Sequence, residues 1–215
     1  MSRPSTKQDS DEASARESIY ALLSRAVLLE PTDDLLSAIL EKRVLRELAP
    51  LVKGGTDVPR PGLEDTVIEF NTLFIVPGTL YVKPFESVYL DTEGETGGQV
   101  MGKSTHAVES MYLETGVALP TSFPEPHDHI GVELGFMELL CRREAEELGK
   151  RDENAVRRTR DIQRTFINKH LAKWITQLCD KIRSSTANPL YLEVAGAMES
   201  FILSERDRLG TEDDK

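Results

Sequence analysis

The strongest helical pattern of the chain lies in residues 125–148, which read EPHDHIGVELGFMELLCRREAEEL. Apolar residues recur in it at spacings of 4, 3, 4, 4 and 3, at Ile130, Leu134, Met137, Cys141, Ala145 and Leu148. Because an α-helix has 3.6 residues per turn, these spacings place the six side chains on one face. We therefore predict a long amphipathic helix from about residue 130, which Asp128 caps or joins in its first turn.

Helical spacing of apolar residues dominates the rest of the chain as well. Further helices are expected to begin near residues 13, 32, 63, 104, 154 and 189, and Pro31, Pro77 and Gly116 mark ends. Residues 78–102 contain several glycines and Pro84, and we expect an ordered loop with at most one helical turn at 86–90. No segment shows the two-residue alternation of half-buried strands. The sequence therefore predicts an all-α fold of roughly eight to ten helices.

Prolines indicate how the helices are grouped. Pro120, Pro124 and Pro126 stiffen a connector that we expect to act as a hinge at about 120–127. It would join an N-terminal lobe at about 13–119 to a C-terminal lobe at about 128–209 of one domain. Residues 1–12 and the acidic residues 210–215 are expected to be disordered tails. Helical groups that share a hinge can exchange between protomers, so a monomer and a domain-swapped dimer both remain open.

Composition narrows the class of protein. The 215 residues include 26 Lys and Arg and 37 Asp and Glu, for a net charge of −11, which argues against nucleic-acid binding. No apolar run approaches the ~18 residues of a membrane-spanning helix, and the polar start lacks the apolar core of a secretory signal. We therefore expect a cytoplasmic protein. Cys141 and Cys179 form no CxxC pair, and we interpret them as buried thiols rather than a disulfide.

Two clusters have the residue types of enzyme sites. Residues 125–133 contain two His, one Asp and two Glu, and His129 and Glu133 lie one helical turn apart, so both could reach one metal ion. Spacing alone is a weak signal, and a capped helix start with local hydrogen bonds is the favoured interpretation. Residues 97–104 read GGQVMGKS, which satisfies the bare GxxxxGK[ST] pattern of a phosphate loop but follows no convincing strand. The helix that begins near Ser104 could still bind an anion weakly. A small metal- or nucleotide-dependent enzyme stays open as the alternative function.

A third cluster suggests peptide binding. Residues 84–89 read PFESVY, and Phe74 precedes them on a predicted helix. Aromatic and proline side chains lose little entropy on binding, and Glu86 could pair with a basic group of a peptide. The simpler interpretation is a loop whose aromatic side chains pack on the core.

Four motifs occur in one order along the chain: Phe70-Asn71-x-Leu73-Phe74-x-x-Pro77, Pro84-x-Glu86-Ser87-x-Tyr89, Tyr112-x-x-x-Gly116, and Glu125-Pro126-x-Asp128-His129-x-x-x-Glu133-Leu134-x-Phe136-Met137. In this the chain resembles the TorD/DmsD/NarJ family of redox-enzyme maturation chaperones over about residues 17–205. The Glu-Pro-x-Asp-His element places it nearer the TorD and DmsD branches than NarJ. His127 stands at the freely varying position of that element.

The resemblance implies an all-helical cytoplasmic chaperone with no catalytic activity and no cofactor of its own. Such proteins bind the apo catalytic subunit of a molybdopterin oxidoreductase of the dimethyl-sulfoxide-reductase class, together with its twin-arginine signal peptide, until the cofactor is inserted. The implied client-binding or hinge segments match 84–89 and 125–129. With the charge pattern they predict a peptide groove whose acids meet the arginine pair, lined by Phe74, Pro84, Glu86, Ser87, Tyr89, Glu125, Pro126, Asp128, His129 and Glu133.

Overall fold

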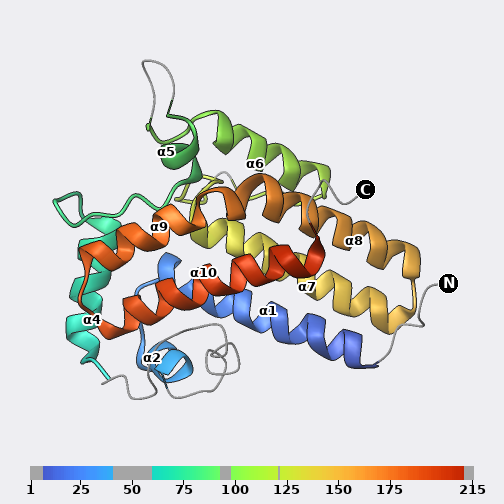
Figure 1. Cartoon of the computed structure of the whole chain (residues 1–215), viewed down its shortest axis with the longest axis horizontal. Helices are drawn as coiled ribbons and strands as arrows, with labels where there is room; N and C mark the ends of the chain where they lie inside the picture. Colours follow the sequence, from blue (N-terminus) through green and yellow to red (C-terminus); the bar gives the residue numbers. More distant parts are fainter. Residues whose placement is uncertain (1–6, 41–59, 93–97, 121, 211–215) are drawn as a thin grey trace.

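The computed structural model describes residues 7–40, 60–92, 98–120 and 122–210, and its regular elements are helices (Figure 1). The elements are α1 (Lys7–Leu28), α2 (Asp33–Leu40), α4 (Leu63–Phe70) with the π-helical turn η1 (Asn71–Ile75), α5 (Glu86–Leu90), α6 (Lys103–Glu114), α7 (Ile130–Lys150), α8 (Glu153–Phe166), the π-helical turn η2 (Ile167–Leu171), α9 (Ala172–Ser185) and α10 (Pro189–Leu209). The all-α prediction is confirmed. None of the described helices is both long and apolar enough to cross a membrane.

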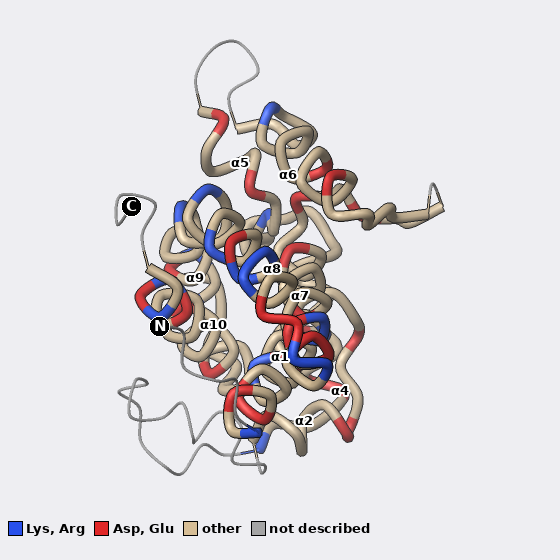
Figure 2. Tube along the Cα trace, turned by 90° about the vertical axis from the view of Figure 1, so that its right-hand side faces the viewer, with Lys and Arg blue, Asp and Glu red and all other residues tan. Residues whose placement is uncertain are grey.

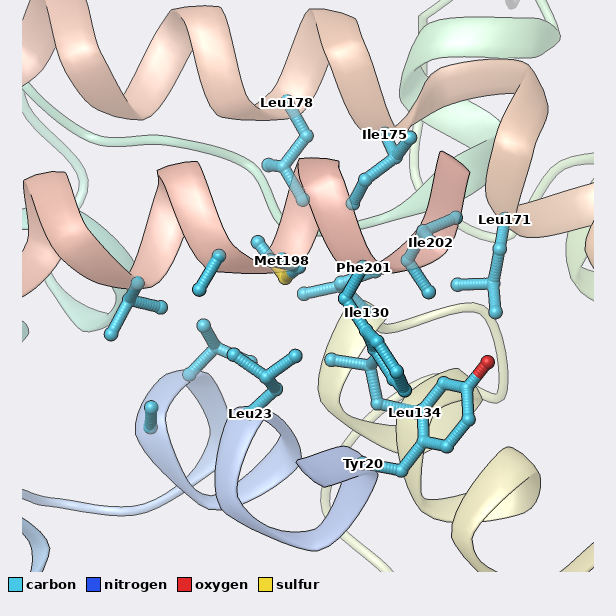
Figure 3. Close-up of a cluster of buried hydrophobic side chains, with 14 of the residues drawn as sticks. Tyr20, Leu23, Ile130, Leu134, Leu171, Ile175, Leu178, Met198, Phe201 and Ile202 are labelled. Atoms are coloured by element: carbon cyan, nitrogen blue, oxygen red, sulfur yellow. The ribbon is translucent and has the colours of Figure 1, made fainter. Parts of the chain in front are cut away.

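Long helices form the body of the molecule. α1 lies along α7, α7 along α8, and α10 along α9, while α5 and α6 lie together at one side (Figure 1). Figure 3 shows the core between them, where Leu23 of α1, Leu134 of α7, Leu178 of α9 and Met198 of α10 point toward one another. All four side chains are buried because the apolar stripe of each helix faces the centre.

This core is shared across the proline connector. Helices that precede residue 120 and helices that follow it contribute to one cluster, in which the Tyr20 ring meets the Phe201 ring at 4.7 Å between centroids. The division into lobes and the hinge at 120–127 stay predictions. Cys141 and Cys179 are free and buried, which confirms their interpretation as apolar core residues.

Three short-range features of the helices form where the sequence predicts them. The short turn at 86–90 is α5, and Gly116, just beyond α6, has a φ of 75° that glycine adopts without strain. The Asn188 side chain accepts a hydrogen bond from Leu190 N at 2.9 Å, so the Asn-Pro pair caps α10 as expected.

The N-terminal tail is shorter than predicted. Residues 7–12 form the first turns of α1, although their polar composition suggested disorder. The physical reason is the length of α7, which offers a partner for these turns: Ser10 Oγ donates to Ala145 O at 3.4 Å, and Ala13 packs with Leu148 and Val156. Residues 1–6 and 211–215 of the expected tails lie outside the described residues.

The helix expected over about 154–183 is interrupted. η2 separates α8 from α9, and its π-helical turn accommodates an extra residue relative to an α-helix. The turn keeps Ile167, His170 and Leu171 buried, and the chain continues directly into α9. His170 thereby becomes part of the site described next.

Candidate functional site

The two motif segments around residues 85 and 129 lie side by side. They form an isolated antiparallel bridge in which Glu86 N donates to Asp128 O at 3.0 Å and Ile130 N donates to Pro84 O at 2.8 Å. The Phe85 ring also meets the His129 ring edge-on, with 5.4 Å between centroids. The tertiary structure therefore joins the loop before α5 to the connector before α7.

Asp128 does not cap α7, and that prediction is wrong. Its Oδ2 instead accepts a hydrogen bond from Ser87 N at 2.9 Å, in the first turn of α5. His129 is the cap of α7, and its Nδ1 accepts a hydrogen bond from Gly131 N at 3.0 Å. Burial lowers the pKa of His129 to about 3, so the neutral imidazole that can accept this hydrogen bond is present. The bridge to Pro84 and Glu86 holds Asp128 over α5, and this leaves the α7 amides to His129.

A buried polar cluster lies beneath this bridge, formed by Glu86, Asp128, Glu133 and His170. His170 Nδ1 lies 2.9 and 3.0 Å from the two carboxylate oxygens of Glu86, which ties α5 to η2. Glu133 is fully buried, and its carboxylate makes no hydrogen bond to a described residue within normal geometry. Burial raises the pKa of Glu133 well above its ordinary value, and the nearby carboxylates of Glu86 and Asp128 raise it further. These neighbours therefore favour the neutral form of Glu133 to higher pH than for an exposed glutamate.

Most residues predicted to line a peptide groove are buried. Those below the surface are Phe74, Pro84, Glu86, Ser87, Asp128, His129 and Glu133. Phe74 packs on Phe70 and Tyr191, with ring centroids 5.8 and 5.6 Å apart. These side chains do not line an open groove because they face the core and the bridge. They support the surface above them, and direct contact with a partner stays a prediction for them.

Tyr89, Glu125 and Pro126, which are partly exposed, line two separate hollows. Tyr89 lines the first, the α9 hollow, which has a volume of about 680 Å³ and is lined by Tyr81, Lys83, Val88, Tyr89, Thr92, Gln177, Asp180, Lys181 and Ser184. Glu125 and Pro126 line the second, the α6 groove, with a volume of about 400 Å³. Its lining comes from Met101, α6 and the connector: Met101, Thr105, His106, Glu109, Tyr112, Leu113, Val117, Ala118, Leu119, Pro120, Phe123, Pro124, Glu125, Pro126 and His127.

The α6 groove has an apolar lining with acidic residues. Met101 is 64% exposed and Leu113 is 59% exposed, so large apolar side chains there are open to a partner. Glu109 and Glu125 add negative charge, and the described lining contains no lysine or arginine. Figure 2 shows α6 as a mainly tan tube with red segments along it and a blue segment at its start. Such a surface suits an apolar segment that carries positive charge.

Sequence reasoning missed Met101, Glu109 and Leu113 as candidate site residues. A signal for the leucine was present, because residues 111–113 of α6 are three consecutive large apolar residues. One face of a helix cannot bury all three, and Tyr112 takes the buried position with an exposed fraction of 2%. No feature of the sequence pointed to Glu109, because it joins the groove only when the connector folds against α6.

The phosphate-loop alternative gains no support from the described part of residues 97–104. Ser104 N and Ser104 Oγ donate to the two carboxylate oxygens of Asp91, at 2.8 and 2.9 Å. Asp91 therefore takes the place at the start of α6 where an anion would bind. A Cβ at Gly102 would lie 2.2 Å from Asp91 Oδ2, so the glycine permits this internal contact. Gly97 lies outside the described residues.

The described residues contain no cluster of side chains that would support the metal-site alternative. Within residues 7–40, 60–92, 98–120 and 122–210, no three His, Cys, Asp or Glu side chains are placed to hold an ion together. His129, the residue expected to share an ion with Glu133, uses Nδ1 to cap α7.

Comparison with known proteins gives consistent matches. A family profile described as "Nitrate reductase delta subunit" matches residues 30–180. The chain is 23% identical to the chaperone protein TorD of Colwellia psychrerythraea over 91% of this chain and 92% of that protein. It is 26% identical to the probable Tat proofreading chaperone DmsD of Haemophilus influenzae over 83% of this chain and 84% of that protein. A crystal structure of a proposed redox enzyme maturation protein from Archaeoglobus fulgidus is 20% identical, covers 90% of this chain and 93% of that chain, and has a TM-score of 0.47.

Proposed function

Because the chain belongs to the TorD/DmsD/NarJ family of redox-enzyme maturation chaperones, we propose that it binds the apo catalytic subunit of a molybdopterin oxidoreductase together with its twin-arginine signal peptide. It holds this client, of the dimethyl-sulfoxide-reductase class, in the cytoplasm until the cofactor is inserted and export or assembly follows. The chain acts as a chaperone and not as an enzyme, as its named relatives do.

The α6 groove is the observation that supports peptide binding most directly. A twin-arginine signal has two arginines followed by an apolar stretch. The apolar wall around Leu113 and Phe123 suits the apolar stretch, and Glu109 and Glu125 suit the arginines. Residues 125–127 line the groove and lead directly into residues 128–130 of the bridge, so the bridge anchors one end of the groove wall.

The apolar contacts are expected to supply most of the affinity. Buried apolar surface contributes roughly 25 cal/mol per Å², whereas an exposed ion pair contributes only about 0–1 kcal/mol. Binding should therefore weaken as salt screens the arginines, and it should persist at high salt because the apolar contact remains.

Titration calorimetry with a twin-arginine signal peptide from a molybdenum oxidoreductase encoded next to this chain tests the proposal. We expect wild type to bind and Leu113→Ser to bind more weakly. Leu192→Ser is the matched control, because Leu192 is 38% exposed on α10 and does not line the groove. Tyr89→Ala tests the α9 hollow in the same way. If wild type binds neither the peptide nor the apo subunit, the proposed function is wrong; if only Tyr89→Ala weakens binding, the peptide occupies the α9 hollow.

A further inference from the structure

One carboxylate of the α6 groove lies between two histidines. Glu109 Oε2 is 3.7 Å from His106 Nδ1, one turn earlier on α6, and Glu109 Oε1 is 3.7 Å from His127 Nδ1 on the connector. All three side chains line the groove, with exposed fractions of 74% for His106, 41% for Glu109 and 30% for His127. The distances fit ion pairs only when the histidines are protonated.

We propose that Glu109 is the carboxylate that pairs with a peptide arginine, and that His106 and His127 compete for it when they become protonated. This inference rests on the proposed function. It adds which group recognises the guanidinium and which condition weakens that contact. The ligand chemistry is a guanidinium beside an apolar segment, which a carboxylate beside Leu113 and Met101 matches.

The position of Glu109 favours it over Glu125, the other carboxylate of the lining. Glu109 stands on α6 one turn before Leu113, so a helix fixes its distance from the apolar wall. Glu125 lies on the connector and also influences Tyr81, whose pKa is raised by burial and by the Glu125 charge. The histidines that flank Glu109 are its ion-pair partners within the described part of the chain.

The direction of the pH effect follows from the groups that face Glu109. These are His106 on its own helix, and His127 and Glu125 on the connector; the hydroxyl of Tyr112 beneath them donates to the His127 carbonyl at 3.1 Å. Arginine stays charged throughout, and carboxylates ordinarily lose their charge only below about pH 4.5. Histidine is the side chain type that gains a proton between pH 8 and 5. A histidine that takes up a proton therefore adds a cation beside Glu109 while the peptide keeps its own charge, and affinity falls.

The test is calorimetry of wild type, Glu109→Gln and the double variant His106→Gln/His127→Gln at pH 7.5 and 5.5. Two peptides are used, one with arginines and one with neutral citrullines in their place. We expect wild type to bind the arginine peptide about two- to fivefold more weakly at pH 5.5, which is the scale of an exposed ion pair. The double histidine variant should lose this pH dependence. Glu109→Gln should lose most of the preference for the arginine peptide that wild type shows at pH 7.5.

The outcomes separate this inference from the proposed function. If wild type binds neither peptide, both are overturned. If wild type binds but Glu109→Gln still prefers the arginine peptide by the same factor, only the role of Glu109 is overturned. If the pH dependence persists in the double histidine variant, it belongs to another group, and the competition is overturned. Circular dichroism of each variant at both pH values verifies that the exposed substitutions leave the fold intact.

Discussion

Helix α7 carries two buried glutamates in opposite electrostatic environments. Glu133 and Glu144 are eleven residues apart, close to three turns, and their exposed fractions are 0% and 1%. The Glu144 carboxylate is 2.8 Å from Arg16 Nη1 and 2.5 Å from Arg160 Nε. Gln163 Nε2 also donates to it at 3.0 Å. At the other end of the helix, Glu133 has carboxylates as neighbours instead of cations.

The pKa values of the two groups move in opposite directions for this reason. Burial alone would raise the pKa of Glu144, but Arg16 and Arg160 outweigh it and lower the pKa below its ordinary value. Burial raises the pKa of Glu133, and Glu86 and Asp128 add to the rise. Burial of a carboxylate therefore does not by itself decide its charge; the neighbours that other helices bring decide it. The Glu144 end of α7 is a charged, fully bonded network, and the Glu133 end is a cluster that excess charge would destabilise.

The largest expected loss of stability comes from removing Arg16, the buried cation at the Glu144 end of α7. Arg16 donates to Glu144, to Glu205 at 2.7 Å and to Gln163 at 2.6 Å. Arg16→Met removes a cation that the buried carboxylates of Glu144 and Glu205 both contact. We therefore expect a loss of about 3–5 kcal/mol in the free energy of unfolding. Arg142→Met is the control, because Arg142 also binds two carboxylates but is 49% exposed; its loss should stay below about 1 kcal/mol. Similar losses in urea denaturation of both variants would contradict the role of burial.

Glu133→Gln tests the other end of the helix by its pH dependence. A folded pKa above the unfolded value means that folded wild type holds a proton which the unfolded chain releases above about pH 4.5. Wild type therefore loses stability as pH rises from there to the folded pKa, by up to about 1.4 kcal/mol per pH unit. Glutamine cannot titrate, so the variant should gain on wild type as pH rises above about 4.5. In Glu144→Gln, the disadvantage relative to wild type should instead shrink as pH falls below about 4.5. Parallel profiles for the two variants would refute the contrast.

Substitution of Gly131, near the start of α7, tests how closely α1 packs against the Glu133 end of that helix. A Cβ at Gly131 would lie 2.8 Å from Leu28 Cβ and 3.3 Å from Ser24 O, whereas a Cβ at Gly135 would meet Ser24 Oγ at 3.7 Å. Gly131→Ala should therefore cost about 1–3 kcal/mol through overpacking. Gly135→Ala should be neutral or stabilise by up to about 1 kcal/mol, because alanine favours the helix. Equal shifts in thermal unfolding would show that the two helices are not held at this distance.

The smallest expected effect concerns the cap that Asp128 provides. Asp128→Ala removes the acceptor for Ser87 N and should cost about 1 kcal/mol near pH 5. The cost should shrink at pH 8, because the substitution also removes a negative charge near Glu133. Asp152→Ala is the control, since Asp152 caps α8 through Ala155 N at 2.9 Å and lies on the surface. Chemical denaturation measures the stability lost in each variant. If the loss in Asp128→Ala grew with pH, Asp128 would not repel the charge of Glu133, and the prediction would be wrong.

The sequence placed two segments together in the candidate site, and the structure pairs them. The stretches 84–89 and 125–133 do come together, yet Glu86 and Glu133 face inward rather than toward a partner. Their charge suggested exposure, because isolated carboxylates are seldom buried. His170 supplies the contact that accommodates Glu86, and no spacing in the sequence connects these two residues.

What the sequence by itself determined is local: the helical stripe of α7, the short α5, the Asn-Pro cap of α10 and the glycine after α6. Each of these depends on residues within about one or two helical turns of one another, so periodicity and capping chemistry suffice to predict them. The tertiary structure decided which cap Asp128 serves, which of two glutamates on one helix has cations beside it, and which apolar residues remain open in the α6 groove. Those outcomes depend on contacts between residues 41 apart, as for Ser87 and Asp128, or 128 apart, as for Arg16 and Glu144. Such contacts exist only once the helices have packed.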